Sequence, residues 1–286
     1  MNKGEFNPVF ALRNEKIVHI SEVERGRKCG CKCPVCNGLL IARKGEQLSH
    51  HFAHYAKTNC EYSGESALHF AAKELLSKAK KMVIPAVSLK FPDSCRPDEL
   101  IHEAMEIDID RVDCEKHFGN VIPDVVVYSG KKFFFIEIYV THGIDERKLA
   151  KLKEARVSTL EVDLSKRNGT VTPEELSHLL LDNCEEKTWV YNAKAEQYYQ
   201  MFLRAADKKP IVQRGFALHV DGCPLRCRIW HEKPYANYFD NCYYCKYHIT
   251  TVHTEDSVED IEEIGYKYIY CSGAKRIANI VDFKQE

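Results

Sequence analysis

The sequence lacks long apolar segments and has almost no net charge. No run of 18 apolar residues occurs in its 286 residues, and the opening Met-Asn-Lys-Gly-Glu contains no apolar secretory core. The 41 Lys and Arg residues are balanced by 42 Asp and Glu, which leaves a formal net charge of -1. We therefore expect a cytoplasmic protein without a membrane segment, in which any attraction to nucleic acid comes from local basic patches.

Three motifs of nucleotide and peptide chemistry are also absent. The chain has no Walker A lysine loop, no Gly-x-Gly-x-x-Gly and no His-Glu-x-x-His. These motifs cradle phosphates or place zinc next to a general base. Their absence argues against an ATPase, a dinucleotide enzyme and a zinc protease, so any ATP-dependent step would need a separate ATPase or helicase as partner.

Cysteine, by contrast, is abundant, with 13 residues gathered mainly in two clusters. In a reducing cytosol such clusters indicate metal sites rather than disulfides. In the first cluster, a Cys-x2-Cys pair and a His-x2-His pair are separated by fourteen residues, as in a tetrahedral zinc site. The predicted ligands are Cys33, Cys36, His51 and His54. His50 and Cys60 are the alternatives within this cluster.

The second cluster predicts another structural Zn²⁺ site near the C-terminus. Four thiolates are the first choice of ligands, namely Cys223, Cys227, Cys242 and Cys245. The Cys-x3-Cys half is less usual than Cys-x2-Cys. Three further residues lie close enough in sequence to compete as ligands, namely His231, His248 and Cys271.

Two carboxylates interrupt an apolar hairpin between Val121 and His142. Asp124 precedes one strand, and strand alternation places Glu137 on the same face as Phe133 and Phe135 of the next strand. A carboxylate in such a place is costly unless a cation or hydrogen-bond donors satisfy it. The simpler interpretation is a turn aspartate and a glutamate paired with a lysine.

The flanking segments complete a strand, strand, helix, strand order. Residues 145–156 have helical periodicity and residues 157–164 read as a strand, so the connection implies a right-handed crossover. Upstream, residues 65–76 predict a helix on which Glu65, His69 and Lys73 share one stripe.

In this order the motifs resemble the competence protein CoiA-like nucleases, over roughly residues 29 to 165. They are Cys-Pro-x-Cys, Lys-Gly, His-Phe-Ala-His, Glu-Ser-x-x-His-x-x-x-Lys, Pro-Asp and Glu-Ile. The resemblance implies an α/β, restriction-endonuclease-like PD-(D/E)XK core. It implies that Asp124 and Glu137 bind catalytic Mg²⁺ or Mn²⁺, and that Glu65 and His69 complete the site.

One position departs from the pattern of this superfamily. Tyr139 stands where a lysine is common, and a phenol is not cationic at neutral pH. Lys148 or Lys151 from the following helix, or His142 at the strand end, are the candidates for the missing cation.

We expect four segments: an N-terminal zinc module (1–62), the nuclease-like core (63–165), a helical connection (166–209) and a C-terminal zinc ribbon (210–286). The core is thus flanked by two small β-rich zinc-binding modules. The expected activity is phosphodiester hydrolysis of nucleic acid, DNA rather than RNA, in DNA processing or anti-phage defence. The alternatives are a catalytically inactive nucleic-acid-binding protein and a zinc-ribbon adaptor in a multi-protein complex.

Overall fold

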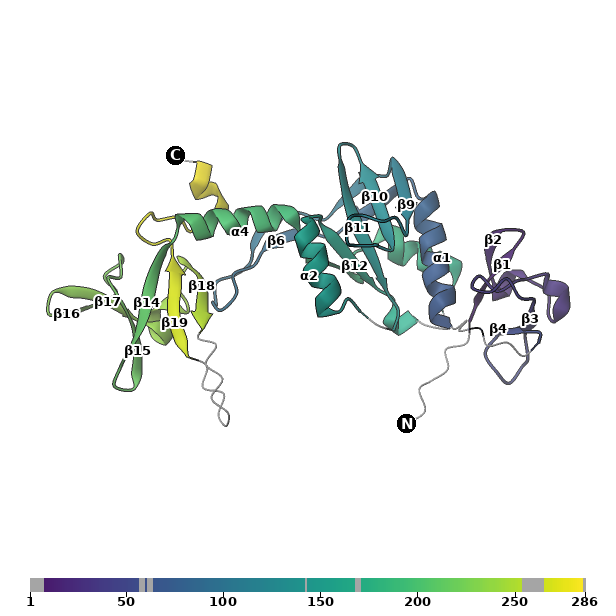
Figure 1. Ribbon diagram of the computed structural model, residues 1–286, viewed down its shortest axis with the longest axis horizontal. Coiled ribbons are helices and arrows are strands. Elements are labelled where there is room, and N and C mark those ends of the chain that lie inside the picture. The colour runs from purple at the N-terminus through teal and green to yellow at the C-terminus, as the bar shows by residue number, and fades with distance from the viewer. Residues whose placement is uncertain are drawn as a thin grey trace. The chain divides into compact units, whose positions relative to one another are not determined.

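The computed structural model describes residues 8–56, 60, 64–141, 143–167, 171–253 and 265–284, and it is a mixed α/β structure with several sheets (Figure 1). The chain forms two compact units. One contains Met1–Pro85 and Ala104–Asn192, and the other contains Ala86–Glu103 and Ala193–Glu286. This division differs from the four expected segments, because the chain passes from one unit to the other three times.

The first unit begins with two small antiparallel hairpins. Their strands are β1 (Phe10–Arg13) with β2 (Lys16–His19), and β3 (Leu40–Arg43) with β4 (His51–His54). Isolated bridges from Lys32 to Leu12 and Leu39, and from Gly26 to Ala42, tie the intervening loop to these strands. The β-rich N-terminal module is therefore held by a small number of backbone pairs.

A five-stranded sheet in the order β13-β12-β11-β10-β9 forms the centre of the first unit. Its strands are β9 (Arg111–Cys114), β10 (Val125–Ser129), β11 (Lys132–Tyr139), β12 (Thr159–Asp163) and β13 (Lys187–Tyr191). The tight β10–β11 turn uses Gly130 in the left-handed region (φ 58°), and its N–H donates to the Asp110 carboxylate at 2.6 Å. Helix α2 (Glu146–Ala155) then connects β11 to β12, which run parallel. The predicted strand, strand, helix, strand order is confirmed.

The two faces of this sheet pack against different helices. Ile136 of β11 belongs to the same buried cluster as Leu68 of α1 (Gly64–Lys78). Phe135, which points the other way, packs with Leu152 of α2. Glu137 shares the face of Phe135, so it lies among apolar side chains on the α2 side, as the alternation predicts.

The expected helical connection over 166–209 is wrong in its middle part. Helix α3 (Pro173–Ser177) begins with a capping box formed by Thr172 and Glu175, and α4 (Ala193–Ala205) is also a helix. Between them lies β13, the edge strand of the central sheet. Its Trp189 packs on Phe134 and donates from Nε1 to the carbonyl of Pro85 at 3.1 Å. The β-branched and aromatic residues of Thr-Trp-Val-Tyr favour a strand.

The second unit is built on a six-stranded antiparallel sheet in the order β16-β17-β15-β14-β19-β18. Its strands are β14 (Asp207–Arg214), β15 (Ala217–Asp221), β16 (Arg228–Trp230), β17 (Lys233–Asn237), β18 (His248–His253) and β19 (Tyr266–Cys271). The hairpin of β6 (Val87–Leu89) and β7 (Glu99–His102) joins this unit, where Leu89 packs with Phe202 of α4.

Strands β5 (Lys81–Ile84) and β8 (Met105–Asp108) come just before and just after residues 86–103 in the chain, and they pair with each other in the first unit. No helix within the described ranges is long and apolar enough to cross a membrane.

Candidate functional site

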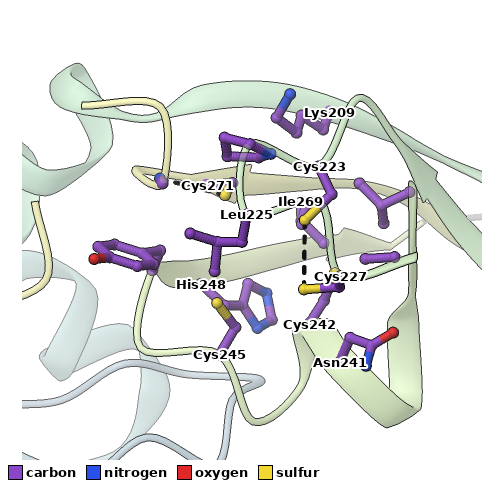
Figure 2. Close-up of a pocket in the computed structure, with 15 residues that line it drawn as sticks. Lys209, Cys223, Leu225, Cys227, Asn241, Cys242, Cys245, His248, Ile269 and Cys271 are labelled. Atoms are coloured by element: carbon purple, nitrogen blue, oxygen red, sulfur yellow. Dashed lines mark hydrogen bonds between the residues drawn. The ribbon is translucent and has the colours of Figure 1, made fainter. Parts of the chain in front are cut away.

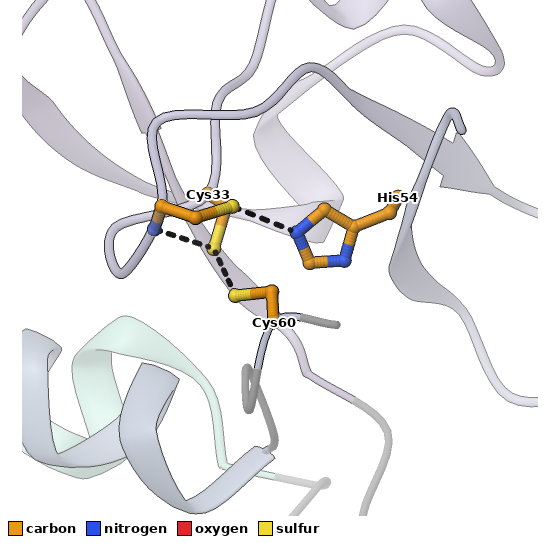
Figure 3. A group of neighbouring side chains, drawn as sticks. Cys33, His54 and Cys60 are labelled. Atoms are coloured by element: carbon orange, nitrogen blue, oxygen red, sulfur yellow. Dashed lines mark hydrogen bonds between the residues drawn. The ribbon is translucent and has the colours of Figure 1, made fainter. Parts of the chain in front are cut away.

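Four potential metal ligands converge in the N-terminal module. The ligand atoms of Cys33, Cys36, His54 and Cys60 all lie within 4.8 Å of one another. Figure 3 shows Cys33, His54 and Cys60 pointing toward a common centre, with the thiols of Cys33 and Cys60 3.8 Å apart. The Cys36 thiol lies 3.3 Å from Nε2 of His54. Three cysteines and one histidine match the donors and number that structural zinc prefers.

The local backbone explains how the two nearby thiols come together. The N–H of Asn37 donates to the carbonyl of Cys33 at 2.9 Å, and Asn37 adopts a left-handed conformation (φ 58°). The turn therefore directs both side chains of the Cys-x2-Cys pair to one side. A hydrogen bond from the N–H of Gly38, followed by one with His54, lowers the pKa of Cys36 to about 7. Cys36 is thus poised to bind metal as a thiolate.

The prediction of His51 as a ligand is wrong, and Cys60 takes its place in the cluster. His51 and His54 lie three residues apart on β4, and such residues point to opposite faces of a strand. His51 is instead 2.9 Å through Nδ1 from the carbonyl of Ser49. The other alternative, His50, is not part of the cluster either.

The cysteines of the second cluster line one pocket in the second unit (Figure 2). The sulfur atoms of Cys223 and Cys227 lie 3.6 Å apart. Burial, and then the neighbouring thiols, raise the pKa of Cys242 to about 12. In the described parts of the chain, only the N-terminal cluster brings three or more ligand atoms within 4.8 Å of one another. The second zinc site therefore remains a prediction.

Two of the three competing ligands of the second cluster line its pocket, and the third does not. Cys271 and His248 line the same pocket as the four predicted cysteines, and His248 has a buried Nδ1 without a hydrogen-bond partner among the described residues. His231 lies in the β16–β17 turn and is not among the pocket-lining residues.

A different arrangement surrounds Asp124, just before β10. His69 Nε2 lies 2.9 Å from its Oδ2, Lys73 Nζ lies 3.5 Å from its Oδ1, and the N–H of Ile138 donates to Oδ2 at 2.9 Å. Burial alone would raise the pKa of Asp124. The hydrogen bond and charge of His69, then the Ile138 N–H and the Lys73 charge, outweigh burial and hold this pKa well below its usual range. Asp124 is therefore a carboxylate at neutral pH.

Glu137 lies beside Asp124 and is only 3% exposed. Its Oε2 accepts a hydrogen bond from Lys148 Nζ at 2.5 Å, while its buried Oε1 has no partner among the described residues. Burial and then the Asp124 charge raise the pKa of Glu137 to about 7, against the opposing effect of Lys148. A buried oxygen without a partner next to a second carboxylate is suited to a cation.

The start of α2 positions Lys148. Asp145 is the N-cap, and its side chain accepts the N–H of Lys148 at 2.6 Å. Lys148 therefore leaves the first turn of the helix toward β11, while Lys151, one turn later, is exposed. Of the three candidate cations that sequence analysis named, Lys148 contacts Glu137. His142 lies outside the described residues.

The structure places the remaining predicted residues less completely. Tyr139 is half-buried at the end of β11, on the face of Glu137. Glu65 lies in the first turn of α1, but its side chain is outside the described part of the structure.

Sequence analysis missed Glu161 on β12. The parallel register pairs it with Glu137, and its Oε2 accepts the N–H of Ile144 at 3.2 Å. The predicted strand contained it, but only the register of β11 with β12 shows that the two glutamates are neighbours.

The first unit is thus an α/β structure with a cysteine-histidine cluster that could bind zinc and a separate carboxylate pair. The family model of the Competence protein CoiA, N-terminal domain, matches residues 15–63 of the chain. This range contains all four residues of the N-terminal cluster, and the match supports a relationship to the CoiA family over that region. Searches of curated proteins and of solved structures found no match.

Proposed function

We propose that this protein is a divalent-metal-dependent nuclease that hydrolyses phosphodiester bonds of DNA. The observation that carries the proposal is Glu137, whose buried Oε1 has no hydrogen-bond partner among the described residues. Glu137 lies beside the ionised Asp124 and is paired through Oε2 with Lys148. A carboxylate pair next to a lysine supplies the two elements of metal-assisted hydrolysis, which are metal ligands and a cation for the phosphate.

Asp124 and Glu137 would hold Mg²⁺ or Mn²⁺, which when bound supplies Lewis-acid activation of water and charge neutralisation. His69 and the N–H of Ile138 fix the orientation of the Asp124 carboxylate. Lys148 in the resting state neutralises Glu137, and its ammonium group is available to a phosphate oxygen nearby. Lys148 thereby takes the role of the lysine that Tyr139 replaces.

The proposal extends to a PD-(D/E)XK core and to two structural zinc ions. The order β10, β11, α2, β12, with Asp124 just before β10 and Glu137 on β11, supports the core. The pocket shared by the four predicted cysteines of the second unit supports the second zinc ion. Metal analysis of the purified chain tests this part, because one zinc per chain would leave only the N-terminal centre.

The activity is tested with labelled single-stranded and double-stranded DNA and RNA in Mg²⁺ or Mn²⁺. The wild type is compared with Glu137→Gln and with the control Glu106→Gln, which removes an exposed carboxylate on β8. We expect cleavage by the wild type and the control but not by Glu137→Gln. Equal cleavage by all three proteins would place the activity elsewhere. No cleavage by any of them would favour a nucleic-acid-binding protein or an adaptor.

A role in DNA processing or anti-phage defence, with a separate ATPase or helicase as partner, fits such an activity. Co-purification with an ATPase from a native source is the test of that partner.

A further inference from the structure

The N-terminal module contains an open groove of about 700 Å³ on the β3–β4 hairpin. Four cations line it, and Glu46 is the one carboxylate among its lining residues. The four cations are Arg25, Arg27, Arg43 and Lys44. In a chain whose net charge is -1, this concentration of positive charge is local.

The backbone brings two of these cations together at a cost to stability. The antiparallel bridge between Gly26 and Ala42 sets Arg25 across from Arg43 on neighbouring segments. Like charges that face each other across paired strands repel. Neither arginine forms an ion pair with the residues that the structure describes, so the repulsion between them is not relieved by a paired carboxylate within that part of the chain. A bound anion would offset it.

The other two cations are held in place before any ligand arrives. The guanidinium of Arg27 lies 3.4 Å from the centre of the Tyr55 ring. Lys44 donates from Nζ to the carbonyls of Val23 and Ser21. Both contacts fix the side chains without neutralising their charge. Preorganised cations bind an anion with less loss of conformational entropy.

Apolar side chains lie next to the charges. Leu48 lines the groove and is 75% exposed, while the Tyr55 ring that carries Arg27 is 48% exposed. Unstacked bases can cover such surfaces, whereas the bases of a duplex are already stacked on one another. The chemistry of the groove therefore fits phosphates joined to accessible bases.

We propose that this groove binds a single strand of DNA through its phosphates. The inference rests on the proposed function, because it specifies a single strand as the form of the nucleic acid substrate. It also gives His51 a place in the binding surface. Because His51 and His54 point to opposite faces of β4, His54 reaches the metal cluster while His51 lines the groove. The metal centre would then hold the hairpin in shape for binding.

The test measures binding of a fluorescent 20-nucleotide oligo(dT), and of a 20-base-pair duplex, to the full-length protein without added Mg²⁺ or Mn²⁺. The double variant Arg25→Ala/Arg43→Ala is compared with Lys28→Ala/Lys32→Ala. The control removes two exposed cations of the same module that do not line the groove. Zinc content is measured for each protein, and both variants should keep it.

We expect the groove variant to bind the single strand about tenfold more weakly. The magnitude of the slope of log K against log salt should fall by about 1.4, because each of the two lost phosphate contacts on a single strand contributes about 0.7. The control should change both quantities much less. Equal weakening in both variants would overturn the groove, and tighter binding of the duplex would overturn the single-strand assignment.

This result is independent of catalysis. If no substrate is cleaved but binding depends on Arg25 and Arg43, the proposed nuclease activity fails and the groove remains. If cleavage depends on Glu137 but the groove variant binds normally, the groove fails and the nuclease remains.

Discussion

The N-terminal cysteine-histidine centre and the Asp124–Glu137 pair are both candidate metal centres of the first unit, but they are built differently. The first brings four protein ligands within 4.8 Å of one another. The second offers two carboxylates, of which one keeps a buried oxygen without a described partner and the other is already bonded to His69. A closed set of ligands suits a structural ion, while an incomplete set leaves positions for water and substrate.

The two sites should also differ in how much metal binding contributes to the free energy of folding. The N-terminal module consists of two short hairpins and a few isolated bridges, so the free energy of metal binding there is largely free energy of folding. Asp124 and Glu137 lie instead on a five-stranded sheet packed by helices on both faces. We therefore expect metal loss to unfold the first site and to leave the second folded.

The largest effect should come from the carboxylate pair. Asp124→Asn and Glu137→Gln should each reduce cleavage below detection, because either change removes one of two ligand charges. For Glu137→Gln the free energy of unfolding should hold or rise, since burial and the Asp124 charge oppose ionisation of Glu137. For Asp124→Asn it should fall, since His69, Lys73 and the Ile138 N–H stabilise the Asp124 carboxylate. Cleavage rates and urea unfolding measure the two quantities. A strongly destabilised Glu137→Gln variant would show that Glu137 is structural.

The zinc centre should respond in the opposite way. Cys60→Ser should release about one zinc per chain and make the segment 8–56 sensitive to protease, because its folding depends on the ion. His51→Ala is the matched change and should keep the zinc, since His51 lies on the other face of β4. Zinc content and limited proteolysis provide the readouts. Loss of zinc from the His51 variant but not from the Cys60 variant would restore the original ligand prediction.

Lys148 tests whether the open site contains a catalytic cation. Lys148→Ala should lower the cleavage rate by roughly 10²-fold, the scale for removing one electrostatic donor to a transition state. Tyr139→Phe should have a much smaller effect, because it removes only a hydroxyl group. Tyr139→Lys should partly rescue the Lys148 variant, since residues 137 and 139 share one face of β11. An inactive Tyr139→Phe with a fully active Lys148→Ala would make the phenol the catalytic group.

A buried lysine in the same sheet allows the effect of burial on a pKa to be measured where no metal site is proposed. Lys187 on β13 is 4% exposed, and burial lowers its pKa to about 8. Between pH 8 and 10.5 the unfolded chain binds more protons at this residue than the folded chain, so its contribution to stability rises with pH. The stability advantage of Lys187→Met should therefore shrink by roughly 2 kcal/mol over this range.

Unfolding in urea, followed by Trp189 fluorescence in a Trp230→Phe background, isolates the first unit. Lys132→Met, which removes an exposed lysine of β11, should show no such trend. A Lys187→Met advantage that stays constant from pH 8 to 10.5 would mean that burial does not perturb Lys187.

Local patterns predicted much of the central sheet. Alternation placed Glu137 on the face opposite Ile136, and helical periodicity placed His69 and Lys73 on one stripe of α1, which the structure shows beside Asp124. These predictions needed only the periods of a strand and a helix, which a single sequence contains.

Long-range pairing was the part that could not be predicted. Cys60 enters the metal cluster from beyond β4, and Glu161 becomes a neighbour of Glu137 only through the parallel register. The edge strand β13 was predicted as part of a helical connection. It has only five residues, and the local sequence pattern does not indicate that it pairs with β12. Such pairings depend on tertiary context rather than on local propensity.

The excursion of residues 86–103 into the second unit has a practical consequence for protein engineering. A truncation after Asn192 would leave behind a hairpin whose Leu89 has lost its packing against Phe202. The hairpin is better removed at the end of the β5–β8 pair, because the register of this pair ends with Ile84 opposite Met105. A two-residue turn spliced between these neighbouring ends would delete the hairpin, together with the Pro85 carbonyl that accepts Trp189 Nε1–H. Combined with truncation after Asn192, it would release the first unit as a minimal protein.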